Sequence, residues 1–179
     1  HYFILKMVFF LIVNLQLSIV NSQSVDQLQI QLHQLEEEKQ KNTESLKLLE
    51  QEIEDLKILL HKEWMIQYGL PKKGNENKTI THHLAYSLQY NEKHEQADWV
   101  IHVLPVDVIN GKFGRTNEFK IDSLISTGTA VKDDYWFSGF DRGHLAPSAD
   151  FRWSSRAINE SYLYSNISPQ RAVLNRERW

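Results

Sequence analysis

The chain has no cysteine among its 179 residues. A disulfide framework is therefore excluded, and the fold depends on packing, with a bound metal as a further source of stability. Internal repeats are also absent outside one heptad region. Hydrophobic residues make up 41% of the chain and charged residues 24%. This composition is ordinary for a soluble globular protein, and the length allows one modest domain with appendages.

The two cationic residue types are almost completely separated along the chain. Arginine is absent before Arg115 and lysine is absent after Lys132. The formal net charge of −3 argues against a partner that is a polyanion. From Arg142 onward, however, six arginines oppose three carboxylates, which leaves a local charge of +3. A guanidinium can hold two phosphate oxygens at once. These arginines are therefore either phosphate contacts or ordinary surface charges.

The first residues are strongly apolar. The run from residue 8 to residue 20 follows Lys6 and ends in small and polar residues. This pattern predicts a secretory signal peptide over residues 1–22, with an uncleaved membrane anchor as the alternative. After signal cleavage we expect no stable membrane insertion. The signal peptide predicts an exported protein, either secreted or located in the bacterial periplasm. A chain without cysteine is compatible with these oxidising compartments.

Residues 23–63 carry a heptad pattern. Nine of the eleven seam positions between Val25 and Leu60 are apolar, and the two polar ones, Lys39 and Asn42, lie together in the middle. Such a seam predicts a coiled-coil helix that forms a parallel homo-oligomer, a dimer or a trimer. The alternative is a single amphipathic helix that packs on the following domain.

A region rich in helix breakers follows the heptads and predicts a domain boundary near residues 64–80. Residues 64–179 then form the globular domain. Alternating apolar residues predict an antiparallel hairpin, and the remaining segments are mixed, so the predicted class is α+β. The expected elements are strands at 84–90, 99–104, 119–121 and 162–165, a helical turn at 154–159 and a helix that starts near residue 170.

A base and a cation stand close together near the end of the chain. An imidazole titrates near neutrality, so His144 is a candidate base for removing a proton from water. Arg142 lies two residues earlier and would project from the same face of a strand. Gly143 between them would leave room for a substrate backbone. Because the motif is short, the alternative is that His144 has only a structural role.

Two asparagines follow. The amide oxygen of Asn175 is a neutral, hard ligand that suits magnesium, although an asparagine at the head of a helix is also a common cap. Asn166 precedes Pro169 and would either orient the site by hydrogen bonding or serve as a turn residue.

Taken together, these segments resemble the DNA/RNA non-specific endonuclease family, the endonuclease G-like ββα-metal (His-Me finger) nucleases. The resemblance covers about residues 64–179. Its central motif is Asp141-Arg142-Gly143-His144. The other matching segments are Tyr68-Gly69-Leu70-Pro71, Ala97-Asp98-Trp99-Val100, Arg115-Thr116-Asn117-Glu118-Phe119, Gly139-Phe140, Leu145-Ala146-Pro147, Arg152-Trp153-Ser154, Tyr164-Ser165-Asn166-Ile167-Ser168-Pro169-Gln170 and Leu174-Asn175-Arg176-Glu177-Arg178-Trp179.

The resemblance implies a ββα-metal nuclease core with an antiparallel sheet, preceded here by the coiled-coil helix. It implies that His144 is the general base, that Asn175 binds magnesium, with manganese as an alternative ion, and that Asn166 supports the site. Arg142 and Arg115 would contact phosphate. The family has a further acidic residue on the metal helix beyond the last residue printed here. We therefore expect this chain to be a C-terminally truncated piece that is inactive alone.

The expected function is magnesium-dependent hydrolysis of phosphodiester bonds in DNA and RNA with little sequence specificity. In this reaction His144 activates water and the ion bound by Asn175 stabilises the leaving group. The first alternative is an inactive, nucleic-acid-binding coiled-coil protein built on a nuclease-like domain. The second is a metal-dependent phosphatase or phosphodiesterase that acts on small nucleotides.

Overall fold

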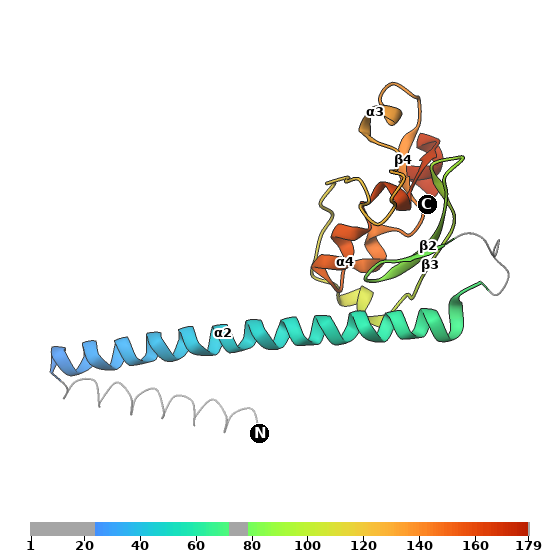
Figure 1. Cartoon of the computed structure of the whole chain (residues 1–179). Helices are drawn as coiled ribbons and strands as arrows, with labels where there is room; N and C mark the ends of the chain where they lie inside the picture. The colour runs from blue at the N-terminus through green and yellow to red at the C-terminus, as the bar shows by residue number, and fades with distance from the viewer. Residues whose placement is uncertain (1–23, 72–78, 179) are drawn as a thin grey trace, which may run out of the picture. The chain divides into compact units, whose positions relative to one another are not determined.

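The structure is a computed structural model that describes residues 24–71 and 79–178 (Figure 1). The predicted signal peptide, residues 1–22, lies outside the described residues. Within the described ranges no helix combines the length and the apolar composition needed to cross a membrane. The chain divides between Gln51 and Glu52 into two compact units, which are described separately here.

One long helix, α2 (Val25–Trp64), contains the predicted heptads. Its first turn is closed by a reciprocal cap, in which the Gln27 amide N–H donates to the Ser24 hydroxyl at 3.4 Å and the Ser24 N–H donates to the Gln27 side chain at 3.1 Å. No glycine or proline interrupts its 40 residues. The leucines of the seam are largely exposed within this single chain, Leu35 at 57% and Leu49 at 53%.

The last turns of α2 belong to the second unit. Ile58 and His61 are buried there. Glu54 accepts a hydrogen bond from the Ser154 hydroxyl, and Asp55 pairs with Arg156 at 2.5 Å. A π-helical turn, η1 (Met65–Gly69), ends the helix and buries Met65.

The predicted hairpin is present and belongs to a three-stranded antiparallel sheet in the order β1-β2-β3 (Figure 1). The strands are β1 (Ile80–His82), β2 (Tyr86–Asn91) and β3 (Gln96–His102). β2 begins later than predicted because the Leu84 N–H donates to the Glu160 carboxylate at 2.7 Å instead of to a neighbouring strand. Five of the six β2 residues are buried, and the hydrophobic core forms around them.

A second sheet pairs β4 (Asp141–His144) with β5 (Ile167–Gln170) in antiparallel register, with His144 opposite Ile167. The predicted strand at 162–165 is wrong. Those residues lead into a 3₁₀ turn, η4 (Tyr164–Asn166), because the Leu163 N–H bonds back to Glu160 at 3.0 Å, and the strand starts only at Ile167. The strand predicted at 119–121 is reduced to one bridge between Lys120 and Leu163.

Short helical segments lie between the strands of the two sheets and after the last strand. The helical turn predicted at 154–159 is confirmed as α4 (Ser155–Glu160), whose N-cap Ser154 accepts from the Ala157 N–H at 3.0 Å. The helix expected from residue 170 appears as a π-helical turn, η5 (Leu174–Arg178). The remaining segments are η2 (Val106–Asn110), α3 (Lys132–Tyr135) and η3 (Ser148–Phe151). The α+β class predicted from the sequence is therefore correct.

Candidate active site

Strand β4 carries the arginine and the histidine of the central motif on one face. The Arg142 guanidinium carbon lies 4.0 Å from the centre of the Phe119 ring, and the His144 ring centre lies 5.7 Å from the same ring. Side chains at i and i+2 of a strand share a face, as the sequence predicts. Both therefore meet one aromatic side chain from a segment more than twenty positions earlier in the chain.

His144 is buried, with 6% of its surface exposed. Its ring packs edge-on against Tyr162, with ring centres 4.7 Å apart. Burial, together with the positive charge of Arg115, lowers the pKa of His144 to about 4. The imidazole is therefore neutral at physiological pH and able to accept a proton, as a general base must.

Arg115 reaches the same place from the loop that precedes Phe119. Its Nε donates to the Tyr162 hydroxyl at 3.4 Å, and that hydroxyl donates in turn to Ser148 at 3.3 Å. The rest of the Arg115 side chain is exposed. The structure thus brings Arg115, one of the two predicted phosphate contacts, to the neighbourhood of His144.

Asn166 is fully buried, with 0% of its surface exposed. Its amide nitrogen donates to the carbonyl oxygens of Ala146 and Ser161 at 3.0 and 2.8 Å, and its amide oxygen accepts from the Ala146 N–H at 2.9 Å. The side chain therefore clamps the backbone two residues after His144. These hydrogen bonds are of the orienting kind that the sequence offered as one alternative for Asn166.

A buried polar cluster holds the neighbour of Asn166. The Ser165 hydroxyl donates to Asp122 at 2.6 Å, and the His83 ring lies 3.1 Å from the same carboxylate oxygen. Burial raises the pKa of Asp122, but the hydrogen bonds from His83 and Ser165 outweigh it and hold that pKa below the usual value. The sequence analysis missed this cluster because its members are far apart in the chain.

Gly143 has a different role from the one expected. A Cβ atom added there would lie 2.1 Å from the side-chain carbonyl carbon of Gln170, which occupies the space above the glycine. The Gln170 amide also donates to the His144 carbonyl at 3.3 Å. The space beside Gly143 therefore accommodates a side chain of the neighbouring strand β5, and no room is left there for a substrate backbone.

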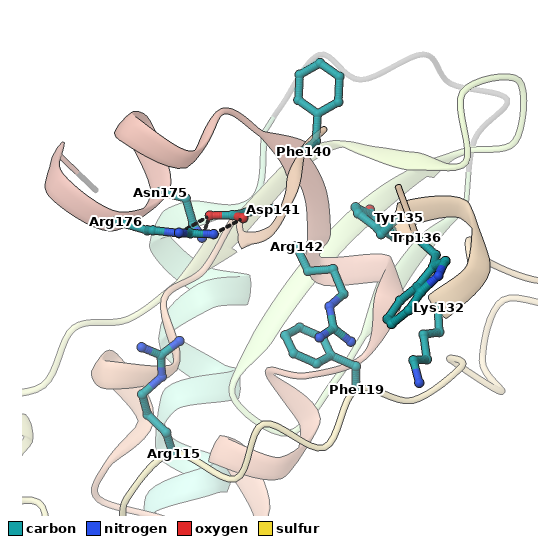
Figure 2. Close-up of a pocket in the computed structure, with 10 residues that line it drawn as sticks. All are labelled: Arg115, Phe119, Lys132, Tyr135, Trp136, Phe140, Asp141, Arg142, Asn175 and Arg176. Atoms are coloured by element: carbon teal, nitrogen blue, oxygen red, sulfur yellow. Dashed lines mark hydrogen bonds and ion pairs between the residues drawn. The ribbon is translucent and has the colours of Figure 1, made fainter. Parts of the chain in front are cut away.

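Asn175 is joined to β4 through Asp141 (Figure 2). Its amide nitrogen donates to Asp141 Oδ2 at 3.2 Å, while Arg176 donates to both carboxylate oxygens at 2.7 Å. These hydrogen bonds from Arg176 and Asn175 lower the pKa of Asp141, which stays ionised. Arg176, one of the arginines expected to be either phosphate contacts or surface charges, thus pairs with a carboxylate of the central motif.

These groups surround a cavity of about 660 Å³. Four cationic side chains and one carboxylate line it, which leaves a formal charge of +3. His144 is buried next to the wall, in contact with Phe119. The lining residues are Arg115, Phe119, Lys132, Tyr135, Trp136, Phe140, Asp141, Arg142, Asn175 and Arg176.

The donor set of the cavity fits a hydrated divalent cation bound through few protein atoms. Asn175 uses its amide nitrogen to bond Asp141, which leaves the amide oxygen as the atom that would bind an ion. Within the part of the chain that the structure describes, no cluster of three or more His, Asp or Glu residues could hold a metal. An ion held here through few protein atoms would keep much of its water shell.

Characterised nucleases are similar to this chain in sequence. Bovine mitochondrial endonuclease G is 34% identical over 117 residues, which cover 64% of this chain and 38% of the relative. The mouse mitochondrial nuclease EXOG is 36% identical over 115 residues, which cover 63% of this chain and 30% of the relative. The chain thus spans well under half the length of these relatives.

These relatives correct the predicted location. Both are mitochondrial nucleases by name, as is the mitochondrial nuclease of Saccharomyces cerevisiae, 36% identical over 94 residues. The prediction of a secreted or periplasmic protein is therefore wrong. An apolar, cysteine-poor amino terminus is too weak a signal to decide a compartment, since its length and flanks overlap among several classes of targeting segment.

The fold and the family are shown by two further comparisons. A chain in the crystal structure of the EndoG/EndoGI complex matches with a TM-score of 0.56 and 26% identity, covering 64% of this chain and 47% of that one. This match confirms the predicted ββα-metal nuclease fold. The family model described as DNA/RNA non-specific endonuclease matches residues 64–179. The chain therefore belongs to the DNA/RNA non-specific endonuclease family.

Proposed function

We propose that this protein is a metal-dependent endonuclease that hydrolyses DNA and RNA with little sequence preference. One observation carries the proposal: β4 presents Arg142 and His144 on one face, beside a cavity that also receives Asn175. A candidate base and a cationic phosphate contact from β4 thus meet a neutral metal ligand from η5. Phosphodiester hydrolysis needs these three functions.

His144 would take the proton from the attacking water. Its low pKa makes it a weak base in the free protein, because the best catalytic base titrates near the working pH. A phosphate bound beside Arg115 would offset the positive charge of its guanidinium. The pKa of His144 would then rise toward the useful range. Because Phe119 touches the imidazole and also lines the cavity, a shift of this ring would open His144 to the substrate.

The arginines account for the lack of sequence preference. Arg142 and Arg115 would contact phosphate oxygens, which are the same at every nucleotide and carry no base information. The net positive charge of the cavity wall suits a polyanion. Both DNA and RNA satisfy these contacts.

Asn175 would hold magnesium, or manganese in its place. Asp141 and Arg176 orient the asparagine, so that its amide oxygen is held in a defined position at the cavity. When bound, the ion would stabilise negative charge on the phosphate and on the leaving oxygen. The chain's own residues supply the proton acceptor and the phosphate contacts.

Removal of divalent metal tests this proposal against the inactive alternative. We expect the full-length protein to nick plasmid DNA and degrade RNA with magnesium, to lose this activity in excess chelator, and to recover it when magnesium is added back. Asn175→Ala should raise the magnesium concentration needed for half-maximal cleavage about 10-fold or more. The matched control Asn159→Ala changes an exposed asparagine and should leave it unchanged.

Two outcomes would contradict the proposal. Nucleic-acid binding without cleavage under any metal condition would favour the inactive binding protein. Turnover of a small phosphodiester without cleavage of polymers would favour the small-nucleotide phosphodiesterase.

We also propose that α2 associates with other copies of the chain through its heptad seam. The leucines of this seam are about half exposed in one chain, and covering them is the main gain of a coiled coil. Light scattering on the full-length protein should give the mass of two or three copies. Leu49→Glu should reduce it to that of one, whereas Lys47→Glu, on the outer face, should not. A monomeric wild-type protein would refute the association.

The names of the relatives support a mitochondrial location for this protein. Cell fractionation with mitochondrial markers checks this, and enrichment of the protein in the medium or envelope would refute it.

A further inference from the structure

Large aromatic side chains are exposed in the segment between α3 and β4, which contributes to the cavity wall. Trp136 is 62% exposed, Phe137 is 93% exposed and Phe140 is 45% exposed. Trp136 and Phe140 line the cavity together with Arg142. The proposed cleavage reaction uses none of these rings. Their exposure costs free energy unless a ligand covers them.

The turn that presents these rings is ordered by its own hydrogen bonds. The Ser138 hydroxyl donates to the Tyr135 carbonyl at 2.9 Å and accepts from the Phe140 N–H at 3.2 Å. Phe137 adopts a φ of 57°, in the left-handed region that a bulky residue rarely occupies. Such backbone strain persists where the surroundings enforce it and is concentrated at binding surfaces.

Trp136 is held between two neighbours. The Lys132 ammonium lies 5.4 Å from the centre of its ring, and Phe137 meets the ring edge-on with centres 5.4 Å apart. A cation over an indole face is a favourable contact that limits the rotation of the side chain. In Figure 2, Trp136 and Lys132 lie on one side of Arg142, and the cluster of Asp141, Asn175 and Arg176 lies on the other.

The cavity thus combines a charged region with an aromatic region. The arginines match the phosphates of a nucleic-acid strand, and flat apolar rings match its bases, which stack on aromatic side chains whatever their sequence. In a duplex the bases are already stacked and paired, so their faces are not available to a protein ring. A strand with unpaired bases is the ligand that satisfies both regions.

Resting on the function proposed above, we infer that Trp136, which meets Phe137 edge-on, is a stacking platform for unpaired bases of the substrate strand. The platform gives the enzyme a preference for single-stranded or locally unpaired nucleic acid without any preference for sequence. Arg142 and Arg115 hold the phosphates, and Trp136 holds a neighbouring base.

Binding without cleavage tests this platform. The full-length protein is titrated in excess chelator against an oligothymidylate, a duplex of equal length, and an oligonucleotide of equal length and charge with abasic sites in place of bases. Fluorescence anisotropy gives the affinities. Trp136→Ala should weaken binding of oligothymidylate by about 5- to 150-fold, the effect of removing one stacked base. Binding of the duplex should change by less than about twofold.

Three controls make the result specific. Trp136→Phe keeps a ring and should restore most of the affinity. Tyr68→Ala removes an exposed aromatic outside this cavity and should leave all affinities unchanged. The abasic strand should bind the wild type about as weakly as Trp136→Ala binds oligothymidylate, and the variant should not distinguish the two strands.

The outcomes separate this inference from the proposed function. An unchanged oligothymidylate affinity in Trp136→Ala overturns the platform alone, and so does an equal loss on duplex and single strand. A wild-type protein that binds none of the nucleic acids overturns both. If Trp136→Ala loses all binding and its circular dichroism spectrum changes, the variant is misfolded, and Trp136→Phe replaces it in the test. Failure of Trp136→Phe to bind oligothymidylate with most of the wild-type affinity would then contradict stacking.

Discussion

Replacing His144 with alanine is expected to reduce phosphodiester cleavage by about 100- to 10,000-fold while nucleic-acid binding is retained. In the function proposed above, the neutral imidazole would accept the proton from water, so its loss would leave the water without a base. Binding should persist because the phosphate contacts come from Arg142 and Arg115, which the substitution leaves in place. The measurement is the rate of plasmid nicking by the full-length protein, with affinity measured separately in chelator.

Two variants distinguish loss of the base from damage to the fold. His144→Gln keeps much of the buried volume beside Tyr162 but does not take up a proton at these pH values, so it should be as inactive as the alanine variant. His94→Ala changes an exposed histidine in the β2–β3 turn and should cleave at the wild-type rate. Cleavage by His144→Ala within about tenfold of wild type would refute the assignment of the base.

The pH dependence of cleavage tests the same assignment of His144 as the base. Burial and Arg115 lower the pKa of His144 to about 4, so the ring is already neutral well below pH 6.5. As the pH falls through this pKa, His144 becomes protonated. The value of kcat/KM for cleavage, which reports the free protein, should fall with it. An acid limb of kcat/KM near 6.5 would contradict this assignment, whereas kcat reports the substrate complex, in which bound phosphate would raise the pKa of His144.

Replacing Asn166 with alanine is expected to lower the free energy of unfolding by about 3–5 kcal/mol. The side chain is completely buried, and its three hydrogen bonds to backbone groups of Ala146 and Ser161 would all be lost. A buried backbone group left without its partner costs about 1–3 kcal/mol. The loss is large because alanine provides neither a donor nor an acceptor and is too small to fill the space.

Denaturant unfolding of the full-length protein measures this effect. Asn166→Asp keeps the shape and the accepted bond from Ala146 but removes both donated bonds, so it should also be strongly destabilised. Asn159→Ala, on the exposed face of α4, should change stability by less than about 0.5 kcal/mol. A loss below about 1 kcal/mol for Asn166→Ala would show that the clamp contributes little.

Several elements were predictable because their signals are local. The heptads of α2 follow from helical geometry, which places every third or fourth side chain on one stripe. The shared face of Arg142 and His144 follows from the pleat of a strand. The cap at Ser154 follows from its preference for the first position of a helix. Each of these signals depends on residues within a few positions of one another.

Two incorrect predictions about local structure had a common cause. The apolar character of residues 162–165 suggested a strand, but the bond from Leu163 back to Glu160 closes a turn. Gly143 suggested room for a ligand, but the partner strand places Gln170 in that space. In both cases a neighbour in three dimensions decided what the local pattern left open.

Local patterns in the sequence establish the family and the long helix, because a specific motif and a helical periodicity record them. Only the tertiary structure decided the burial of Asn166, the clamp of Asp141 on Asn175 and Arg176, and the aromatic wall beside the arginines. Those contacts join residues that are as many as 35 positions apart. The free energy of such contacts depends on how distant segments pack, and a local pattern holds no information about it.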